Sequence, residues 1–240
     1  MANKIIAIIT VLFFAGLISL YYGNTLFILF ESDEPSESIG TPGRGALKNG
    51  KRLPSRGGNF SAYSRLGALL GRNSVHHRVR DCVVEAYRAM HEKYPDKVFV
   101  YGETGRPSGG SFKPHKTHQN GLSVDFMVPV MDDKGRSLPL PASPFNKFGY
   151  GIEFDRAGRA DELQIDFEAM AAHIFELQSA AGRTRLKIQK IIFAPELQPH
   201  LFKTEHGKKI RASITFSSKP AWVRHDEHYH VDFVVNNELE

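Results

Sequence analysis

Two short segments of this chain, residues 115–125 and 225–233, carry side chains that the fold has to bring to one place. They hold five of the eleven histidines in 240 residues. Because alternate residues of a strand point to the same face, His228 and His230 would share one side of a strand. A histidine and an aspartate of the first segment would complete the two imidazoles and one carboxylate that are typical of catalytic zinc sites. The pattern predicts a zinc centre of the kind that hydrolases use.

His118, Asp125 and His230 are the predicted ligands of this centre. Asp125 lies within an alternating apolar segment, residues 122–128, where an unpaired carboxylate would cost on the order of several kcal/mol. If the strands over 122–128 and 229–235 are neighbours, a metal ion can bridge Asp125 and His230, and His118 can reach it from the preceding loop. Zinc is the expected ion, because it accepts imidazole together with a carboxylate and has no redox chemistry.

Three further histidines flank the predicted ligands. His228 shares a face with His230 and is the candidate general base, or a donor to a developing oxyanion. His225 and His115 would lie further out and orient a water molecule or the ligands. The acidic neighbours are expected to be solvated or to hydrogen-bond around the site rather than to bind the metal: Asp226, Glu227 and Asp232.

Other catalytic motifs are absent from the sequence. His91-Glu92 is followed by Lys93-Tyr94-Pro95, so the helical motif with two histidines that some zinc peptidases use is incomplete. The sequence contains neither a G-x-S-x-G elbow nor the S-x-x-K, S-D-N and K-T-G elements of acyl-serine enzymes. Cys82 is the only cysteine, which excludes an internal disulfide and is typical of a small buried residue.

The N-terminal segment, residues 1–30, is expected to be a signal anchor, with a cleaved signal peptide as the alternative. The 26 residues from Ile5 to Phe30 contain no charge, and a membrane-spanning helix needs about 20 apolar residues. Lys4 precedes the run, and acidic residues follow it. This asymmetry favours a cytoplasmic N-terminus and a body in the periplasm, tethered to the inner membrane, or released there if the segment is cleaved.

The remaining chain is expected to form an extended arm over residues 31–58, rich in Pro, Gly, Ser and charge, and one domain over residues 59–240. The predicted class is α+β: a small antiparallel sheet with flanking helices and long loops. The expected helices are 75–93, capped by Asn73 or Ser74, and 166–182; the expected strands are 98–101, 122–128, 188–193, 214–216 and 229–235; the expected loops are 102–117, 131–150 and 194–209.

The charge of the chain indicates the kind of partner. The formal net charge is +5, which suits an anionic partner such as a membrane surface or a carboxylate-bearing polymer. Nucleic acid is not expected, because the chain has no dense run of Lys and Arg and no interleaving of aromatic and basic residues.

The two histidine segments resemble those of a known family. His115-x-x-His118-Gln-Asn-Gly-Leu-Ser-Val-Asp125, together with Trp222-Val-Arg-His225-Asp-Glu-His228-Tyr-His230, is similar to the penicillin-insensitive murein endopeptidases (MepA family). These belong to the LAS group of zinc peptidases, which share an H-x6-D element and a late H-x-H. The stretch from Tyr101 to Gly110 resembles the lead-in of the family. The resemblance covers about residues 58–235.

This resemblance implies zinc-dependent hydrolysis of the peptide cross-links of peptidoglycan, after D-alanine and without an acyl-serine intermediate. It implies His118, Asp125 and His230 as ligands, His228 in the catalytic role with His225 beside it, and His115 as a further histidine near the metal. The chain departs from familiar members in its single cysteine and its anchor-like N-terminus. The alternatives are a zinc D,D-carboxypeptidase or dipeptidase of the same group, and a non-catalytic peptidoglycan-binding protein with a structural metal.

Overall fold

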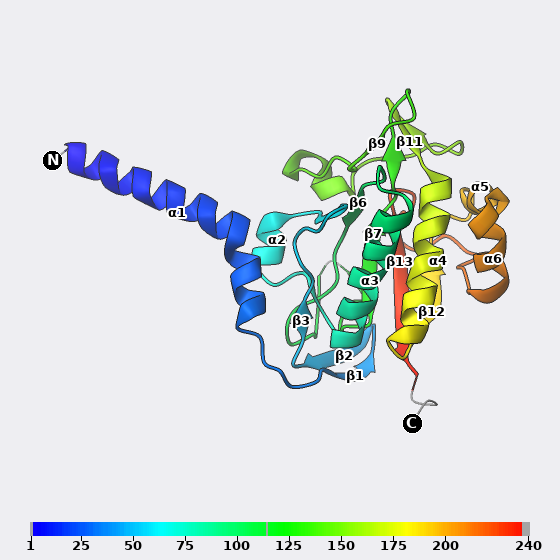
Figure 1. The fold of residues 1–240 in the computed structure, drawn as a ribbon, viewed down its shortest axis with the longest axis horizontal. Coiled ribbons are helices and arrows are strands. Elements are labelled where there is room, and N and C mark those ends of the chain that lie inside the picture. Colours follow the sequence, from blue (N-terminus) through cyan, green and yellow to red (C-terminus); the bar gives the residue numbers. More distant parts are fainter. Residues whose placement is uncertain (1, 114, 237–240) are drawn as a thin grey trace.

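The structure is a computed structural model that describes residues 2–113 and 115–236. A long N-terminal helix, α1 (Ala2–Leu29), projects from the body of the molecule (Figure 1). It is long and apolar enough to cross a membrane, and none of its apolar window is buried in the body. The expected N-terminal apolar segment is therefore a continuous helix.

The body is built around a five-stranded sheet in the order β12-β13-β7-β6-β4. These strands are β12 (Leu186–Ile192), β13 (His228–Val235), β7 (Ser123–Met127), β6 (Phe99–Tyr101) and β4 (Phe60–Ala62). All neighbours in the sheet are antiparallel except β4 and β6, which are parallel. The small, largely antiparallel sheet with helices confirms the predicted α+β class.

Two long helices, α3 (His77–Lys93) and α4 (Phe167–Arg183), lie side by side against the sheet (Figure 1). The helix α4 begins close to the predicted residue 166, and Asp166 caps it by accepting a hydrogen bond from the amide of Ala169. The helix α3 begins later than predicted, and its cap is His76 rather than Asn73 or Ser74. The reason is that β5 (Ser74–Val75) pairs with β3 (Lys51–Arg52), which holds these residues in an extended conformation.

The alternation of side chains on β13 and β7 separates the core from the site. Tyr229, Val231 and Phe233 of β13 are buried in the core, together with Val124 and Phe126 of β7. Each fully buried apolar side chain of this size contributes about 1.5–3 kcal/mol to folding. The polar residues between them face the other side of the sheet, as the sequence predicted.

Residues 31–58 differ from the extended arm that we expected. They contain the hairpin of β1 (Glu37–Thr41) and β2 (Arg44–Lys48), followed by β3. Leu47 is 3% exposed and Leu53 is fully buried. Pro42 and Gly43 form the turn between β1 and β2, and the apolar residues of the segment are too few to give a periodic signal.

Smaller elements lie between the long ones: α2 (Arg65–Leu69), β8 (Val130–Met131), β9 (Ser137–Leu138), the 3-10 helix η1 (Pro144–Gly149), β10 (Arg159–Ala160), β11 (Leu163–Ile165), α5 (Gln198–Lys203) and α6 (Glu205–Ser213). The prediction of plain loops over 131–150 and 194–209 is wrong, since the former contains strands and the latter two helices. The predicted strand over 214–216 is also wrong: only Phe216 forms a bridge, with Ile191.

Candidate functional site

The sheet places Asp125 and His230 directly opposite each other on the adjacent strands β7 and β13. The Nδ1 atom of His230 lies 2.8 Å from Oδ1 of Asp125. Both side chains are buried, at 1% and 2% exposure. Asp125 and His230, which are 105 positions apart in the sequence, therefore form one buried polar site on the face of the sheet opposite the apolar core.

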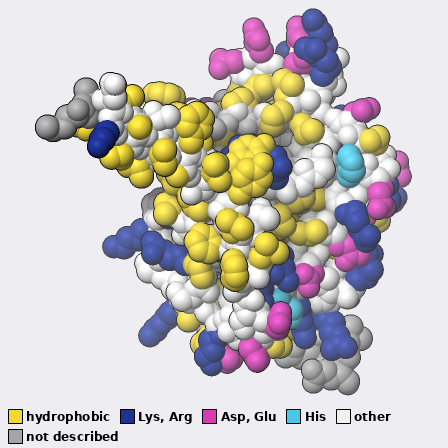
Figure 2. All heavy atoms as spheres, turned by 60° about the vertical axis from the view of Figure 1, so that its left-hand side comes forward, with side chains coloured by type: hydrophobic (Ala, Val, Ile, Leu, Met, Phe, Trp, Pro, Cys, Tyr) yellow, Lys and Arg dark blue, Asp and Glu magenta, His cyan; other side chains and the backbone are white. Residues whose placement is uncertain are grey.

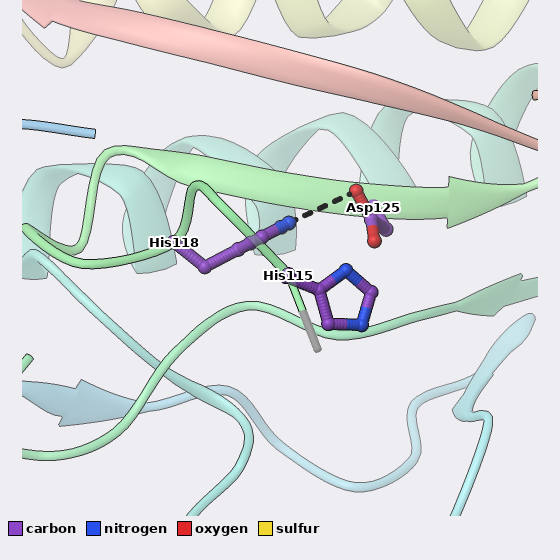
Figure 3. Close-up of side chains that lie close together, drawn as sticks. All are labelled: His115, His118 and Asp125. Carbon is purple, nitrogen blue, oxygen red and sulfur yellow. Dashed lines mark ion pairs between the residues drawn. The ribbon is translucent and has the colours of Figure 1, made fainter. Parts of the chain in front are cut away.

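His118 reaches the same carboxylate from the loop before β7. Its Nε2 atom lies 3.2 Å from Oδ1 of Asp125, and the rings of His118 and His230 are perpendicular, 4.8 Å apart. Figure 3 shows His118 and Asp125 pointing toward one another, with His115 beside them. The backbone of His118 has a φ of +67°, a conformation that costs an L-residue about 1–2 kcal/mol. In this strained conformation the loop directs the imidazole ring of His118 toward Asp125.

The hydrogen bonds around the two imidazoles determine which nitrogens carry protons. Nδ1 of His118 donates to the carbonyl of Thr104 at 3.0 Å, so its Nε2 atom points a lone pair at Asp125. Nε2 of His230 donates to Oδ1 of Asp232 at 2.8 Å, which leaves Nδ1 facing Asp125. If Nδ1 of His230 carried no proton, two lone pairs and a carboxylate oxygen would converge, and this arrangement would be repulsive unless a metal cation lay among them.

The buried atoms of the site fit a metal ion. Within the residues described, Nε2 of His118 is buried and has no hydrogen-bond partner. Burial opposes a charge on His230, but its hydrogen bonds with Asp125 and Asp232 raise its pKa to about 10. A proton on His230 thus meets the need for positive charge that a metal ion would otherwise meet. The donor set of imidazoles with one carboxylate matches zinc.

His115 extends the cluster on the side of the loop. One ligand atom each from His115, His118 and Asp125 lie within 4.8 Å of one another (Figure 3). Nε2 of His115 also lies 2.9 Å from Oε2 of Glu103. Burial opposes a charge on His115, but its hydrogen bond with Glu103 and the negative charges of Asp125 and Glu103 together outweigh this effect and raise the pKa of His115. His115 is therefore a further possible ligand, oriented by Glu103.

His228 lies at the edge of the cluster, with Nε2 at 3.9 Å from Oδ2 of Asp125 and Nδ1 at 2.8 Å from Oε1 of Glu227. Burial lowers the pKa of His228 to about 4 and raises the pKa of Glu227 to about 9. At neutral pH both shifts favour an uncharged imidazole beside an uncharged carboxyl group. The ring of His225 lies 4.4 Å from that of His228, which places both predicted catalytic histidines together.

The carboxylates near β13 are buried rather than solvated. Asp232 accepts from Ser123 as well as from His230, and Glu227 contacts His228. Asp226 accepts a hydrogen bond from the amide of Phe154 and pairs with Arg224. We expected these carboxylates either to be solvated or to hydrogen-bond around the site. Asp232 and Glu227 do hydrogen-bond to histidines of the site. Asp226 instead links the loop that precedes β13 to Phe154.

Sequence reasoning did not identify Tyr150 or Glu103 as site residues. The hydroxyl of Tyr150 donates to Oδ2 of Asp125 at 3.0 Å and accepts from the amide of Glu103 at 2.9 Å. A Cβ atom on Gly102 would lie 2.5 Å from this hydroxyl, so a glycine is needed there. Glu103 lies in the stretch from Tyr101 to Gly110, whose resemblance to the family could have pointed to it. The only sequence feature that marks Tyr150 is the glycine on each side of it.

Comparison with known proteins is consistent with this geometry. No curated protein matches the chain. The family model for penicillin-insensitive murein endopeptidase matches residues 38–238, which include the whole sheet and every histidine of the site. The resemblance seen in the two histidine segments is thereby confirmed over most of the chain. The chain belongs to the penicillin-insensitive murein endopeptidase family.

Proposed function

We propose that this protein is a zinc-dependent D,D-endopeptidase that hydrolyses the D-alanyl peptide cross-links of peptidoglycan. His118, Asp125 and His230 would hold the zinc ion, and His115 is a further candidate ligand. The observation that carries this proposal is the buried Nε2 atom of His118, which faces Asp125 at 3.2 Å without a hydrogen-bond partner. A peptidase family and a site that needs a cation together support a metallopeptidase.

The residues around the proposed zinc site suit peptide hydrolysis. Zinc bound there would act as a Lewis acid on the scissile carbonyl and on water. With the ring proton of His228 on Nδ1, its Nε2 atom faces the site as an acceptor, and it can take a proton from the attacking water and later deliver one to the leaving amine. Glu227 hydrogen-bonds Nδ1 of the same ring, which fixes the orientation of His228. His225 lies against this ring and would help to hold it.

A cavity beside His225 offers a place for the peptide. It has a volume of about 170 Å³ and is lined by residues 192–196 and 220–226. Trp222 is 62% exposed at this cavity, and the ammonium group of Lys116 lies 4.6 Å from its ring centroid. The aromatic face and the cation suit a peptide that carries carboxylates, as does the net charge of +5.

We propose further that α1 remains attached as an inner-membrane anchor and that the body lies in the periplasm. The uncharged run from Ile5 to Phe30 and the single Lys4 before it support this orientation. Peptidoglycan, the substrate class of the family, lies on that side of the membrane.

Metal analysis combined with a digest of cross-linked muropeptide dimers tests the proposal. The full chain in detergent should contain one zinc ion and convert dimers to monomers, and a chelator should abolish the conversion. His228→Ala should keep its zinc and lose at least about 100-fold in turnover, the contribution typical of a general base. Dimers left intact by the zinc-loaded protein would refute the endopeptidase, and release of terminal D-alanine alone would indicate a carboxypeptidase. A zinc site whose loss affects only stability would indicate a structural metal.

A further inference from the structure

The last turns of α1 are packed into the body instead of ending in a flexible connection. Asn24 is 3% exposed; its side-chain amide donates to the carbonyl of Leu53 at 3.0 Å and accepts from Asn73 at 3.0 Å. Gly23 leaves room for Leu69 of α2, since a Cβ atom there would lie 2.4 Å from Cδ1 of that leucine. In Figure 1, α1 projects freely over most of its length and then lies beside α2.

The chain that follows α1 is also fixed to the body. Glu31 accepts a hydrogen bond from the amide of Arg52 at 2.6 Å and pairs with Arg80 at 3.1 Å. The carbonyl of Ser32 accepts from the ammonium group of Lys51. The anchor and the body are therefore joined rigidly, with no slack between them.

The membrane boundary falls close to this junction. A span needs about 20 residues, and counting from Asn3 brings it to Tyr21 and Tyr22, a residue type enriched at membrane interfaces. Two exposed cations lie over the ring of Tyr21: Arg65 at 4.2 Å and Arg56 at 4.8 Å from its centroid. Aromatic and basic side chains thus meet where phospholipid headgroups would lie.

Large apolar side chains are exposed on the body at the same level. Leu66 of α2 and Leu70 directly after it are 52% and 68% exposed, and Leu26, Leu29 and Phe30, at and just past the end of α1, are 52%, 72% and 85% exposed. Figure 2 shows hydrophobic side chains continuing from the projecting helix onto the adjoining face of the body. We call these five residues, together with Arg56 and Arg65, the α1–α2 face. An apolar surface of this kind with a basic rim is typical of membrane contact.

We propose that the α1–α2 face docks the body onto the anionic phospholipid headgroups of the membrane that α1 spans, and that the buried Asn24 holds it there. The inference rests on the proposed membrane insertion of α1 and adds a defined contact surface. The apolar side chains would enter the interface, and the arginines would bind lipid phosphates. The active site would consequently stand at a fixed height and orientation, which restricts the enzyme to peptidoglycan near the membrane.

Spin labels on single introduced cysteines test the docking in the full chain. Cys82 is fully buried, and burial raises the pKa of its thiol to about 12, so it should not react in the folded protein. Labels are placed at Leu66→Cys and Leu70→Cys, at Leu12→Cys within the span, and at Val234→Cys as an exposed control at the far end of β13. The protein is placed in nanodiscs of phosphatidylethanolamine and phosphatidylglycerol, and collision with oxygen and with a water-soluble nickel chelate is measured.

The labels at 66 and 70 should favour oxygen severalfold more than the label at 234, and should approach the label at 12. If the label at 12 favours oxygen while the labels at 66 and 70 match the label at 234, α1 is inserted in the membrane but the proposed docking face is wrong. If the label at 12 also favours the nickel chelate, α1 does not span the membrane, and the proposed insertion on which this inference rests is wrong. Labels at 66 and 70 that are shielded from both reagents would mean that protein, such as a second copy of the chain, covers the face. None of these results depends on the muropeptide digest, which tests the catalytic proposal separately.

Two variants test the role of Asn24 and of lipid charge. Asn24→Leu should shift the label at 66 toward the value at 234 and leave the label at 12 unchanged, whereas Thr10→Leu, a matched change on the exposed part of α1, should shift neither. Neutral phosphatidylcholine nanodiscs should reduce the oxygen preference at 66, and Arg56→Gln with Arg65→Gln should have the same effect. A label at 66 that stays in lipid with Asn24→Leu, or that ignores lipid charge, would overturn the corresponding part of the proposal.

Discussion

At the scale of single residues, the proposal depends on the two nitrogens of His118. One is satisfied by a backbone carbonyl, and the other faces Oδ1 of the buried Asp125 carboxylate, the same oxygen that Nδ1 of His230 contacts. The left-handed backbone of His118 directs this ring at Asp125. The affinity of the site for metal should therefore depend strongly on this one side chain.

Replacing His118 by Ala should lower zinc affinity by at least about 100-fold, because loss of residues that merely orient ligands already costs about 10–100-fold. His91→Ala serves as the control, since His91 is exposed and lies outside the site. Zinc content after dialysis against a metal buffer, measured by mass spectrometry, checks the expectation. Equal zinc in the two variants would remove His118 from the ligand set.

The residues that sequence could identify are those whose spacing carries the information. His118 and Asp125 flank one turn into a strand, and His228 and His230 alternate along another, so their convergence followed from two local patterns. Tyr150 reaches Asp125 from a loop of irregular backbone, and no spacing rule links it to β7. A contact of this kind depends on the course of the loop backbone, which cannot be predicted from the types of residue in the loop.

At the scale of elements, apolar periodicity located the long helices and central strands, but missed the short ones. The helices α5 and α6 have six and nine residues, too few turns for a clear stripe, and Pro and Gly occur in them. Thr204 caps α6 by accepting from the amide of Gly207 at 2.9 Å, a signal that capping chemistry could have provided. Short elements are stabilised by their neighbours more than by their own sequence.

The cap of α4 offers a test at this scale. Asp166 accepts from the amide of Ala169 at 2.9 Å and pairs with Lys97 at 2.6 Å. Asp166→Ala should lower the free energy of unfolding by about 1–2 kcal/mol, whereas Asp166→Asn should lose much less, because Asn caps a helix as well as Asp does. Urea denaturation of the two variants measures the difference. If Asn and Ala are equally destabilising, the ion pair with Lys97 and not the cap stabilises the start of α4.

At the scale of the whole molecule, the fold class and the meeting of the two histidine segments could be predicted, whereas the attachment of residues 1–58 to the body could not. The hairpin of β1 and β2 contributes the buried Leu47, and Asn24 is buried against Leu53. These contacts attach to the body two segments, residues 1–30 and 31–58, whose composition is that of a membrane anchor and a linker. Burial there depends on single side chains fitting the body, and single residues give no periodic signal.

The packing of α4 on the sheet includes a titratable group, and this should make the stability of the whole molecule depend on pH. His173 of α4 is fully buried; it stacks on Tyr87 of α3 at 4.7 Å, and its Nδ1 atom lies 2.5 Å from the hydroxyl of Tyr229 of β13. Burial lowers its pKa from 6.5 to about 3. The unfolded chain therefore binds a proton here at a higher pH than the folded chain does.

Between pH 6.5 and about 3, the unfolded state holds the extra proton at His173, so stability should fall as the pH falls through this window. At about 1.4 kcal/mol per pH unit, this group alone should remove about 2 kcal/mol by pH 5. His173→Gln cannot titrate and should show a correspondingly flatter dependence of unfolding free energy on pH between 6.5 and 5. The exposed control His91→Gln should keep the slope of the parent chain. A His173→Gln variant with the parent slope would show that the layer between α4 and the sheet admits the charged imidazole, and the folded core would then have to be wetter than its packing indicates.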